Sequence, residues 1–281
     1  MLTLFGVAWI LRKIRSSAQE RPPVAEKLLR SPGESLRREL EKIDEQINDI
    51  IVLTTFGTPL FVTLYFLFVS GSSKPSGWPI GSTIVVVIVV VIGFTFLVWK
   101  LVNLIARRRN YRLGFAGERA VAEELNRLML DGCRVFHDVP MEPYGNIDHV
   151  LITPAGLYAI ETKARRKRKA PPGKRDYEVV FDGKSLQFPC AVDFSSLEQA
   201  RQQADRLRIF LSKAVGEQLK VGAILTLPGW RVTSRVKDDI KVLNPKQIGA
   251  AVLDDRLPAL PKGLVNRVVY QLDQKCRDVE F

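Results

Sequence analysis

Two long uncharged segments, residues 50–69 and 80–99, constrain the fold of this chain more than any other feature of its sequence. A helix of about 20 apolar residues is roughly 30 Å long, which matches the hydrocarbon core of a bilayer. Trp78 precedes the second segment and Trp99 ends it, at the positions where membrane proteins concentrate aromatic side chains. The pattern predicts a transmembrane hairpin over residues 50–106, and a pair of buried core helices is the alternative.

The distribution of cations predicts the orientation of this hairpin. Lys74 is the one cation in the connector 70–79, whereas several Lys and Arg precede the first segment and Lys100 and Arg107–Arg109 follow the second. Because Lys and Arg are retained on the cytoplasmic side, both termini are expected in the cytoplasm. The apolar start of residues 1–30 is expected to form an interfacial or linker segment beside the bilayer.

Residues 31–49 are predicted to form an amphipathic helix that leads into the first apolar segment. Ser31 and Glu34 have the spacing of a capping box, with Pro32 at the first helical position. One face of the helix is apolar and consists of Leu36, Leu40, Ile43, Ile47 and Ile50. This seam can pack on the body of the same chain or pair with a second copy, which would make a homo-oligomer through residues 36–50 and the spans.

Residues 107–281 are expected to fold as one cytoplasmic domain that carries most of the net charge of +12. The basic excess favours an anionic partner, either nucleic acid or phospholipid. Three cysteines and two histidines are too few for a disulfide scaffold or a His-rich metal site. The hydrophobic pattern predicts a mixed α/β class, with helices at 114–130, from Ser195 and at 263–275, strands at 147–152, 157–163 and 221–227, and a hairpin of 177–181 with 185–188.

An acidic residue and a lysine end the strand 157–163, as Glu161-Thr-Lys163. A turn centred between Pro154 and Ala155 would place Asp148 directly opposite Glu161, with Lys163 on the same face. Two adjacent carboxylates repel each other unless a proton or a cation lies between them, and their oxygens suit Mg²⁺ or Mn²⁺. A surface hairpin with a cross-strand salt bridge is the alternative.

Two further residues support this arrangement. Glu118 lies on the apolar face of the helix 114–130, where an acid without a partner is costly, although an acid in a first helical turn is also favoured by the helix dipole. Gln199 lies in the first turn of the helix that starts at Ser195, beside its apolar seam, where a surface glutamine is the default. His149 follows Asp148 in its strand and is expected to point to the opposite face in a structural role.

A run of cations, Arg165, Arg166, Lys167, Arg168 and Lys169, follows the proposed active strand. Such a run can neutralise several phosphates of a nucleic acid. A solvated charge run and a loop that binds lipid headgroups are the alternatives, and Arg107–Arg109 are assigned to headgroups. Because few aromatic residues accompany the run in the sequence, no base-stacking platform is expected.

Taken together, Gly117-Glu118, Gly145–Val150, Ile160–Lys163 and Leu197–Ala200 resemble the nuclease-related domain (NERD) family over about residues 111–230. That family is similar to the PD-(D/E)xK, restriction-endonuclease-like nucleases, although Ile147 precedes the acid where the superfamily name has proline. The resemblance implies a mixed sheet flanked by helices. It also implies site roles: metal ligands Asp148 and Glu161, water-positioning Lys163, supporting acid Glu118, and Gln199 to orient the water or substrate.

The resulting expectation is a membrane-tethered, Mg²⁺- or Mn²⁺-dependent nuclease that hydrolyses phosphodiester bonds of DNA, with RNA as the second choice. It would act at the cytoplasmic face, and the family resemblance implies the bacterial inner membrane. The alternatives are a non-catalytic module that binds nucleic acid at the membrane and a membrane scaffold that recruits a protein partner.

Overall fold

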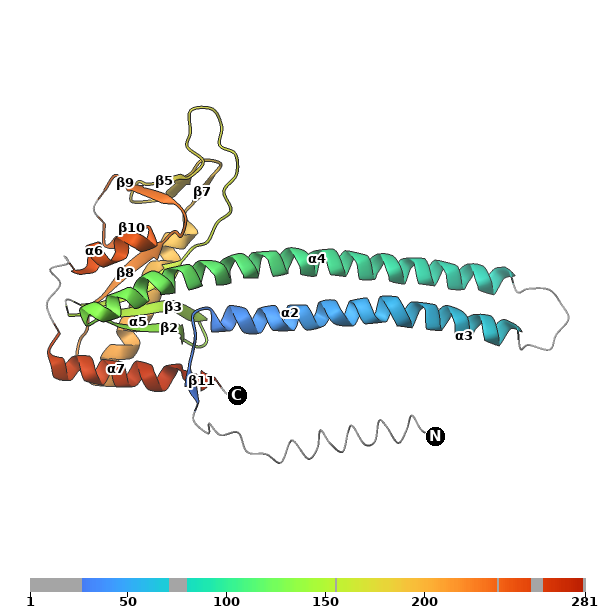
Figure 1. The fold of residues 1–281 in the computed structure, drawn as a ribbon, viewed down its shortest axis with the longest axis horizontal. Coiled ribbons are helices and arrows are strands. Elements are labelled where there is room, and N and C mark those ends of the chain that lie inside the picture. Colours follow the sequence, from blue (N-terminus) through green and yellow to red (C-terminus); the bar gives the residue numbers. More distant parts are fainter. Residues whose placement is uncertain (1–26, 71–79, 155, 237, 254–259, 280–281) are drawn as a thin grey trace.

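The computed structural model describes residues 27–70, 80–154, 156–236, 238–253 and 260–279. A long pair of helices projects from an α/β body that contains the three described sheets (Figure 1). Most of the predicted N-terminal interfacial segment and the connector with Lys74 lie outside the described residues.

The first arm of the helical pair runs from Glu34 to Ser70. It consists of α2 (Glu34–Val52), a π-helical turn η1 (Leu53–Gly57) and α3 (Thr58–Ser70). The second arm is α4 (Ile80–Arg127), a single helix of 48 residues. The two arms lie side by side along their length (Figure 1).

Both arms are long and apolar enough to cross a membrane, and their apolar stretches are almost entirely exposed in the structure. Phe68 is 78% exposed and Ile92 is 63% exposed. A core helix of a soluble protein would instead bury such side chains, so the alternative of two buried core helices is wrong.

The apolar seam of α2 packs on α4 of the same chain. Ile43 and Ile50 are buried together with Leu104 of α4. An ion pair between Asp44 and Arg108, with an Nε–Oδ1 distance of 2.5 Å, joins the same two helices. Of the two predicted partners for the seam, the structure therefore provides the one within the chain.

No helix end separates the apolar part of α4 from the body. The helix passes through residue 107 without interruption, and the predicted helix 114–130 is its last part, followed by the 3₁₀ turn η2 (Leu128–Asp131). Gly132 ends this helical stretch in the left-handed region at φ 81°. The apolar arm and the helical part of the body are thus one continuous rod.

A mixed sheet of five strands, in the order β10-β8-β4-β3-β2, forms the centre of the body. Strands β2, β3 and β4 are antiparallel, whereas β4, β8 and β10 are parallel. Their bounds are β2 (Arg134–Pro140), β3 (Asn146–Thr153), β4 (Gly156–Thr162), β8 (Val221–Thr226) and β10 (Ile240–Leu243). The predicted α/β class with a mixed sheet is confirmed.

Helices cover both faces of this sheet because its strands are apolar on both sides. Helices α5 (Ser195–Val215) and α7 (Lys262–Cys276) share a buried cluster with one face. The last turns of α4 and the short α6 (Ile248–Leu253), which follows the 3₁₀ turn η3 (Pro245–Gln247), cover the other face. Alternate residues of one strand therefore enter two different cores.

Two smaller sheets complete the body. The first has the order β7-β6-β5-β9 and contains the predicted hairpin at Gly183. The four strands of this sheet are β5 (Glu178–Phe181), β6 (Leu186–Phe188), β7 (Ala191–Asp193) and β9 (Arg231–Ser234). The second pairs β1 (Leu28–Leu29) with β11 (Arg277–Val279), which joins the two ends of the described chain.

The β3–β4 hairpin has the predicted register. His149 pairs with Ile160, and Thr153 pairs with Gly156. Continuing this register by one residue places Asp148 opposite Glu161. The geometry on which the candidate site depends is therefore present.

Of the two predicted helix starts, that of α5 at Ser195 is confirmed and that of α2 is wrong in detail. At α5 the Asp193 carboxylate accepts hydrogen bonds from the Ser196 backbone N–H at 3.1 Å and from its hydroxyl at 2.7 Å. Helix α2 begins at Glu34 after Gly33, not at Pro32, and the Ser31 hydroxyl donates to the Glu34 carboxylate at 3.0 Å. Polar side chains near each helix start form these hydrogen bonds, although in a different pattern from the predicted one.

Candidate active site

Three acidic side chains from three elements converge at one edge of the central sheet. They are Glu118 of α4, Asp148 of β3 and Glu161 of β4. Glu118 is 7% exposed and Glu161 is 4% exposed, whereas Asp148 is half-buried. Burial raises the pKa of Asp148, and the negative charges of Glu161 and Glu118 raise it further.

Burial and mutual repulsion hold these carboxyls close to their neutral form. Burial raises the pKa of Glu118 to about 8, with added repulsion from Asp138 and Glu161. Burial raises the pKa of Glu161 to about 7, although the Lys163 ammonium and a hydrogen bond from Gln203 oppose the rise. Burial and both neighbouring acids raise the pKa of Asp148 well above its usual range. A cation is needed before all three can ionise near neutral pH.

Hydrogen bonds fix one oxygen of each ligand candidate on the hairpin. The backbone N–H of Thr162 donates to Oδ2 of Asp148 at 2.6 Å. The side-chain amide of Gln203 donates to Oε2 of Glu161 at 2.6 Å. Within the described part of the chain, Oδ1 of Asp148 and Oε1 of Glu161 receive no hydrogen bond, so both remain available for a cation.

The glutamine at this site is Gln203, not the predicted Gln199. Gln199 is exposed, whereas Gln203 is buried one turn later on α5 and also donates to the Asn146 carbonyl at 3.3 Å. Its buried Oε1 has no partner within the described residues. The sequence carried a signal for this, because position 203 lies within the apolar repeat of α5, as Glu118 does on α4.

A fourth buried carboxylate, Asp138 of β2, was missed by the sequence analysis. Its backbone is left-handed at φ 49°, and its side chain is 3% exposed. The carboxylate accepts hydrogen bonds from the backbone N–H of Ser35 at 2.9 Å, from the Ser35 hydroxyl at 2.6 Å and from the Asn146 amide at 3.0 Å. An acid inside an apolar strand, where aspartate is disfavoured, is the signal that could have identified it.

Residues that precede the first apolar arm thus reach the site. Arg30 donates to the Asp138 carboxylate at 3.2 Å and to Asp278 of β11 at 2.8 Å. A Cβ on Gly33 would lie 2.6 Å from the Phe115 ring and 3.5 Å from Oε2 of Glu118. The start of α2 is therefore packed directly against the carboxylate cluster.

The basic run has more defined partners than a solvated charge run would have. Arg165 forms an ion pair with Asp193, and its guanidinium lies 4.6 Å from the centre of the Phe188 ring. The Lys167 ammonium lies 5.7 Å from the centre of the Trp230 ring. Few aromatic residues accompany the run in the sequence, but tertiary packing brings these two to it from distant positions. Three further members, Arg166, Arg168 and Lys169, are exposed.

The two histidines form a separate pair, in which His149 is buried and His137 is half-buried. Their Nδ1 atoms lie 2.8 Å apart, and Nε2 of His137 lies 3.3 Å from the Asn126 side-chain oxygen. Burial lowers the pKa of His137 to about 4 and that of His149 well below its usual range. His149 is fully buried on the face opposite Asp148, as predicted for a structural residue.

The donor set suits a cation that retains most of its water. Among the described residues, no group of three or more His, Cys, Asp and Glu side chains is arranged to hold a metal ion. The predicted ligands are two carboxylates, Asp148 and Glu161. Magnesium is commonly held by one or two carboxylates with water completing the shell, so this pair fits Mg²⁺ better than a metal that needs a full protein cage.

Comparison with known proteins finds a family match for part of the body. Residues 113–228 match the model of the family described as "Nuclease-related domain". No curated protein and no solved structure matches the chain. The matched segment contains Glu118, Asp148, Glu161, Lys163 and Gln203, and it leaves out the first arm, most of α4 and the two terminal strands. The resemblance inferred from the sequence is confirmed for this segment, which indicates a nuclease-related function.

Proposed function

We propose that this chain is a membrane-tethered, metal-dependent nuclease that hydrolyses phosphodiester bonds of DNA, with RNA as the second choice, at the cytoplasmic face. The observation that supports this most is the pairing of Asp148 and Glu161 beside Lys163 in a nuclease-related segment. A scaffold would not need two carboxylates buried against each other, because their repulsion costs stability.

Each side chain then has a defined task. Asp148 and Glu161 would hold Mg²⁺ or Mn²⁺, which supplies charge compensation for the phosphodiester and a more acidic water. Lys163 is half-buried and positions the attacking water, while the Gln203 amide keeps Glu161 in its rotamer. Glu118 lies behind the pair as a buried acid whose pKa near 8 keeps it protonated at neutral pH. It can then donate a hydrogen bond within the cluster.

The exposed apolar arms support a membrane anchor. Because α4 is one continuous helix, the distance from Trp99 to Glu118 along it is about 30 Å at 1.5 Å per residue. The site would therefore lie outside the headgroup layer but at a fixed height above it. The cation distribution favours cytoplasmic termini, and the resemblance favours the bacterial inner membrane.

One observation favours the non-catalytic alternative, in which the body binds nucleic acid without cutting it. No three-ligand metal group is formed by the described residues, and the carboxyls have raised pKa values. A site of this kind could remain protonated and inactive at neutral pH. Binding without turnover in Mg²⁺ or Mn²⁺ would support this alternative.

The test measures cleavage of single- and double-stranded DNA and RNA by the full chain in detergent, with Mg²⁺, Mn²⁺ or EDTA. The full chain is required because Arg30 and Ser35 contact Asp138. Asp148→Asn and Lys163→Met should abolish metal-dependent cleavage. Lys184→Met is a matched control, because Lys184 belongs to a second acid-x-Lys triplet at an exposed turn. Unchanged cleavage by both site variants would contradict the assignment.

A further inference from the structure

A basic hollow opens beside the carboxylate site. It has a volume of about 370 Å³, at the lower end of the range of about 300–1,000 Å³ typical of small-molecule sites. Three arginines line it, Arg165, Arg166 and Arg168. Its remaining wall consists mainly of apolar side chains, namely Leu113, Ala164, Phe188, Pro189, Ala191 and Trp230.

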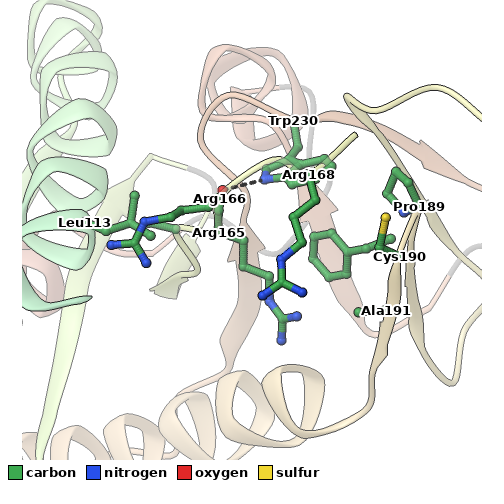
Figure 2. A pocket seen from close by; sticks show the side chains of 10 residues that line it. Leu113, Arg165, Arg166, Arg168, Pro189, Cys190, Ala191 and Trp230 are labelled. Atoms are coloured by element: carbon green, nitrogen blue, oxygen red, sulfur yellow. Dashed lines mark hydrogen bonds between the residues drawn. The ribbon is translucent and has the colours of Figure 1, made fainter. Parts of the chain in front are cut away.

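Two of the guanidinium groups point into this hollow on the same side. Figure 2 shows the ends of Arg165 and Arg168 next to the ring that faces Cys190, while Arg166 extends toward Leu113 of α4. Arg165 is paired with Asp193, but Arg168 makes no ion pair within the described part of the chain. Arg166 donates only to neutral oxygens, the Arg109 carbonyl at 2.7 Å and the Asn110 side chain at 2.9 Å. The hollow therefore holds more positive charge than its own acid neutralises.

A second hollow of about 470 Å³ is lined by Lys167 of the same basic run. Lys167, Arg231 and Lys246 contribute its cations, and Tyr177 its exposed aromatic ring. Trp230 lines both hollows. The first hollow adjoins α4 at Leu113 and the second at Ala120 and Glu124, which lie about 10 and 16 Å further along the helix. Cations thus follow a path parallel to α4.

This path begins next to the candidate catalytic residues. Ala164 separates Lys163 from Arg165, so these two residues are at most about 7 Å apart along the chain. The Ala164 Cβ packs so closely on α4 that a Cβ on Gly117 would lie 2.6 Å from it. Ala164 belongs to the wall of the hollow, and Gly117 immediately precedes Glu118 of the carboxylate cluster. The contact between Ala164 and Gly117 therefore joins the hollow to the cluster.

We propose that the two hollows form the track of an unpaired nucleic-acid strand, so that the substrate of the proposed nuclease is single-stranded, a specificity that rests on the proposed function. A phosphate lies against Arg165 and Arg168, and the base attached to it lies against the apolar wall of the first hollow. Lys167 and Arg231 contact the next phosphates in the second hollow. Apolar contact with bases needs no sequence match, so the track accepts any sequence.

The size of the hollows favours an unpaired strand over a duplex. A recess of this volume admits one nucleotide, whereas the backbones of a double helix would touch only its rim. A lipid headgroup is disfavoured by height, because Leu113 lies about 20 Å beyond Trp99 along α4 and the headgroup layer is only about 5–8 Å thick. An unpaired strand has both the phosphates that the arginines can bind and the bases that the apolar wall can contact.

Cys190 provides a readout that is independent of cleavage. It is exposed and lines the first hollow, whereas Cys133 and Cys276 are buried. The rate of maleimide labelling of Cys190 is measured on the full chain in zwitterionic nanodiscs with EDTA present. Oligothymidylate of about 16 nucleotides should protect Cys190 at least tenfold at saturation. Its duplex with oligoadenylate should protect it far less.

Two charge-matched variants make the test specific. Arg168→Gln should weaken strand binding about tenfold and reduce the slope of log affinity against log salt by about 0.7. Lys213→Gln removes the same charge at an exposed site on α5 and should change the affinity less than twofold. Equal effects of the two variants would overturn the proposal.

The remaining outcomes separate this inference from the proposed nuclease activity. Protection of Cys190 by the single strand, with no cleavage in Mg²⁺ or Mn²⁺, supports the track and overturns the nuclease. Cleavage without protection supports the nuclease and overturns the track. Equal protection by the duplex, or protection by phosphatidylglycerol nanodiscs without any oligonucleotide, also overturns the track, the latter in favour of a headgroup site.

Discussion

Asp148 and His149 are neighbours on β3, yet they belong to two buried clusters of opposite character on the two faces of the central sheet. Both clusters favour neutral side chains, because burial raises the pKa of Asp148 and lowers that of His149. The difference lies in what the neutral groups can do for one another. In a pair of neutral imidazoles, one ring can donate a hydrogen bond and the other can accept it. His137 and His149 therefore satisfy each other's Nδ1 atoms.

The carboxylate cluster has no comparable solution once its members ionise. Ionised carboxylates are acceptors only, so Asp148 and Glu161 depend on Thr162 and Gln203 for donors and on a cation for charge. Burial therefore produces a packing unit on one face and an unfinished binding site on the other. Whether a buried cluster becomes a packing unit or a binding site depends less on the direction of the pKa shift than on whether neighbouring groups can complete its hydrogen bonds.

The largest expected effect contrasts these two adjacent residues. Asp148→Asn should lower kcat of metal-dependent cleavage by at least a thousandfold, a loss of about 4 kcal/mol in transition-state stabilisation. His149→Asn should retain activity within a few-fold while lowering the unfolding temperature, because it disrupts only the opposite core. Cleavage kinetics and thermal unfolding of the full chain in detergent measure both. An equal loss of kcat in the two variants would contradict the division between the faces.

The next largest effect concerns the attachment of α2 to the site. Asp138→Ala leaves Ser35, Asn146 and Arg30 without their buried acceptor and should cost about 3 kcal/mol of folding stability, or roughly 6–12 °C in the unfolding midpoint. Asp205→Ala is the control, because Asp205 forms only an exposed pair with Arg208. The control should change stability by less than about 1 kcal/mol. Near-UV circular dichroism follows the loss of packing in the body.

The two clusters should give opposite pH dependences of stability in EDTA. His137 has a pKa of about 4 in the fold against an ordinary 6.5, so the unfolded chain binds more protons and stability falls as pH drops from 6.5 toward 4. Glu118 has a pKa of about 8 against an ordinary 4.5, so the fold binds more protons and stability falls as pH rises through that window.

Each group contributes a slope of at most about 1.4 kcal/mol per pH unit. Glu118→Gln should flatten the loss between pH 4.5 and 8 and leave the acid side unchanged, and Mg²⁺ should also reduce that loss by favouring the ionised carboxylates. Chemical denaturation of the full chain at a series of pH values measures both. A wild-type-like slope above pH 4.5 in the variant would contradict the assigned cause.

The smallest expected effect separates two glutamines one turn apart. Gln203→Ala removes the donor to Glu161 and should lower kcat about tenfold, equivalent to about 1.4 kcal/mol. Gln199→Ala changes an exposed side chain and should have no measurable effect on kcat. The result is read from cleavage rates at saturating substrate. A larger loss for the Gln199 variant would restore the assignment made from the sequence.

The sequence alone determined several features that depend on neighbours along the chain. Uniform apolar composition identified the two long arms, and period-two alternation with a short turn set the β3–β4 register that places Asp148 opposite Glu161. The same alternation sent His149 to the other face. These predictions succeeded because hairpin register and helix length follow from local geometry.

Only the tertiary structure decided which distant residues complete the site. Ser35 reaches Asp138 across 103 positions and Arg30 reaches Asp278 across 248, and Trp230 meets the basic run from 65 positions away. The choice of Gln203 over Gln199 depends on which turn of α5 faces β4. Such contacts are set by how elements pack against each other, and periodicity within one element specifies its buried face but not the partner that covers it.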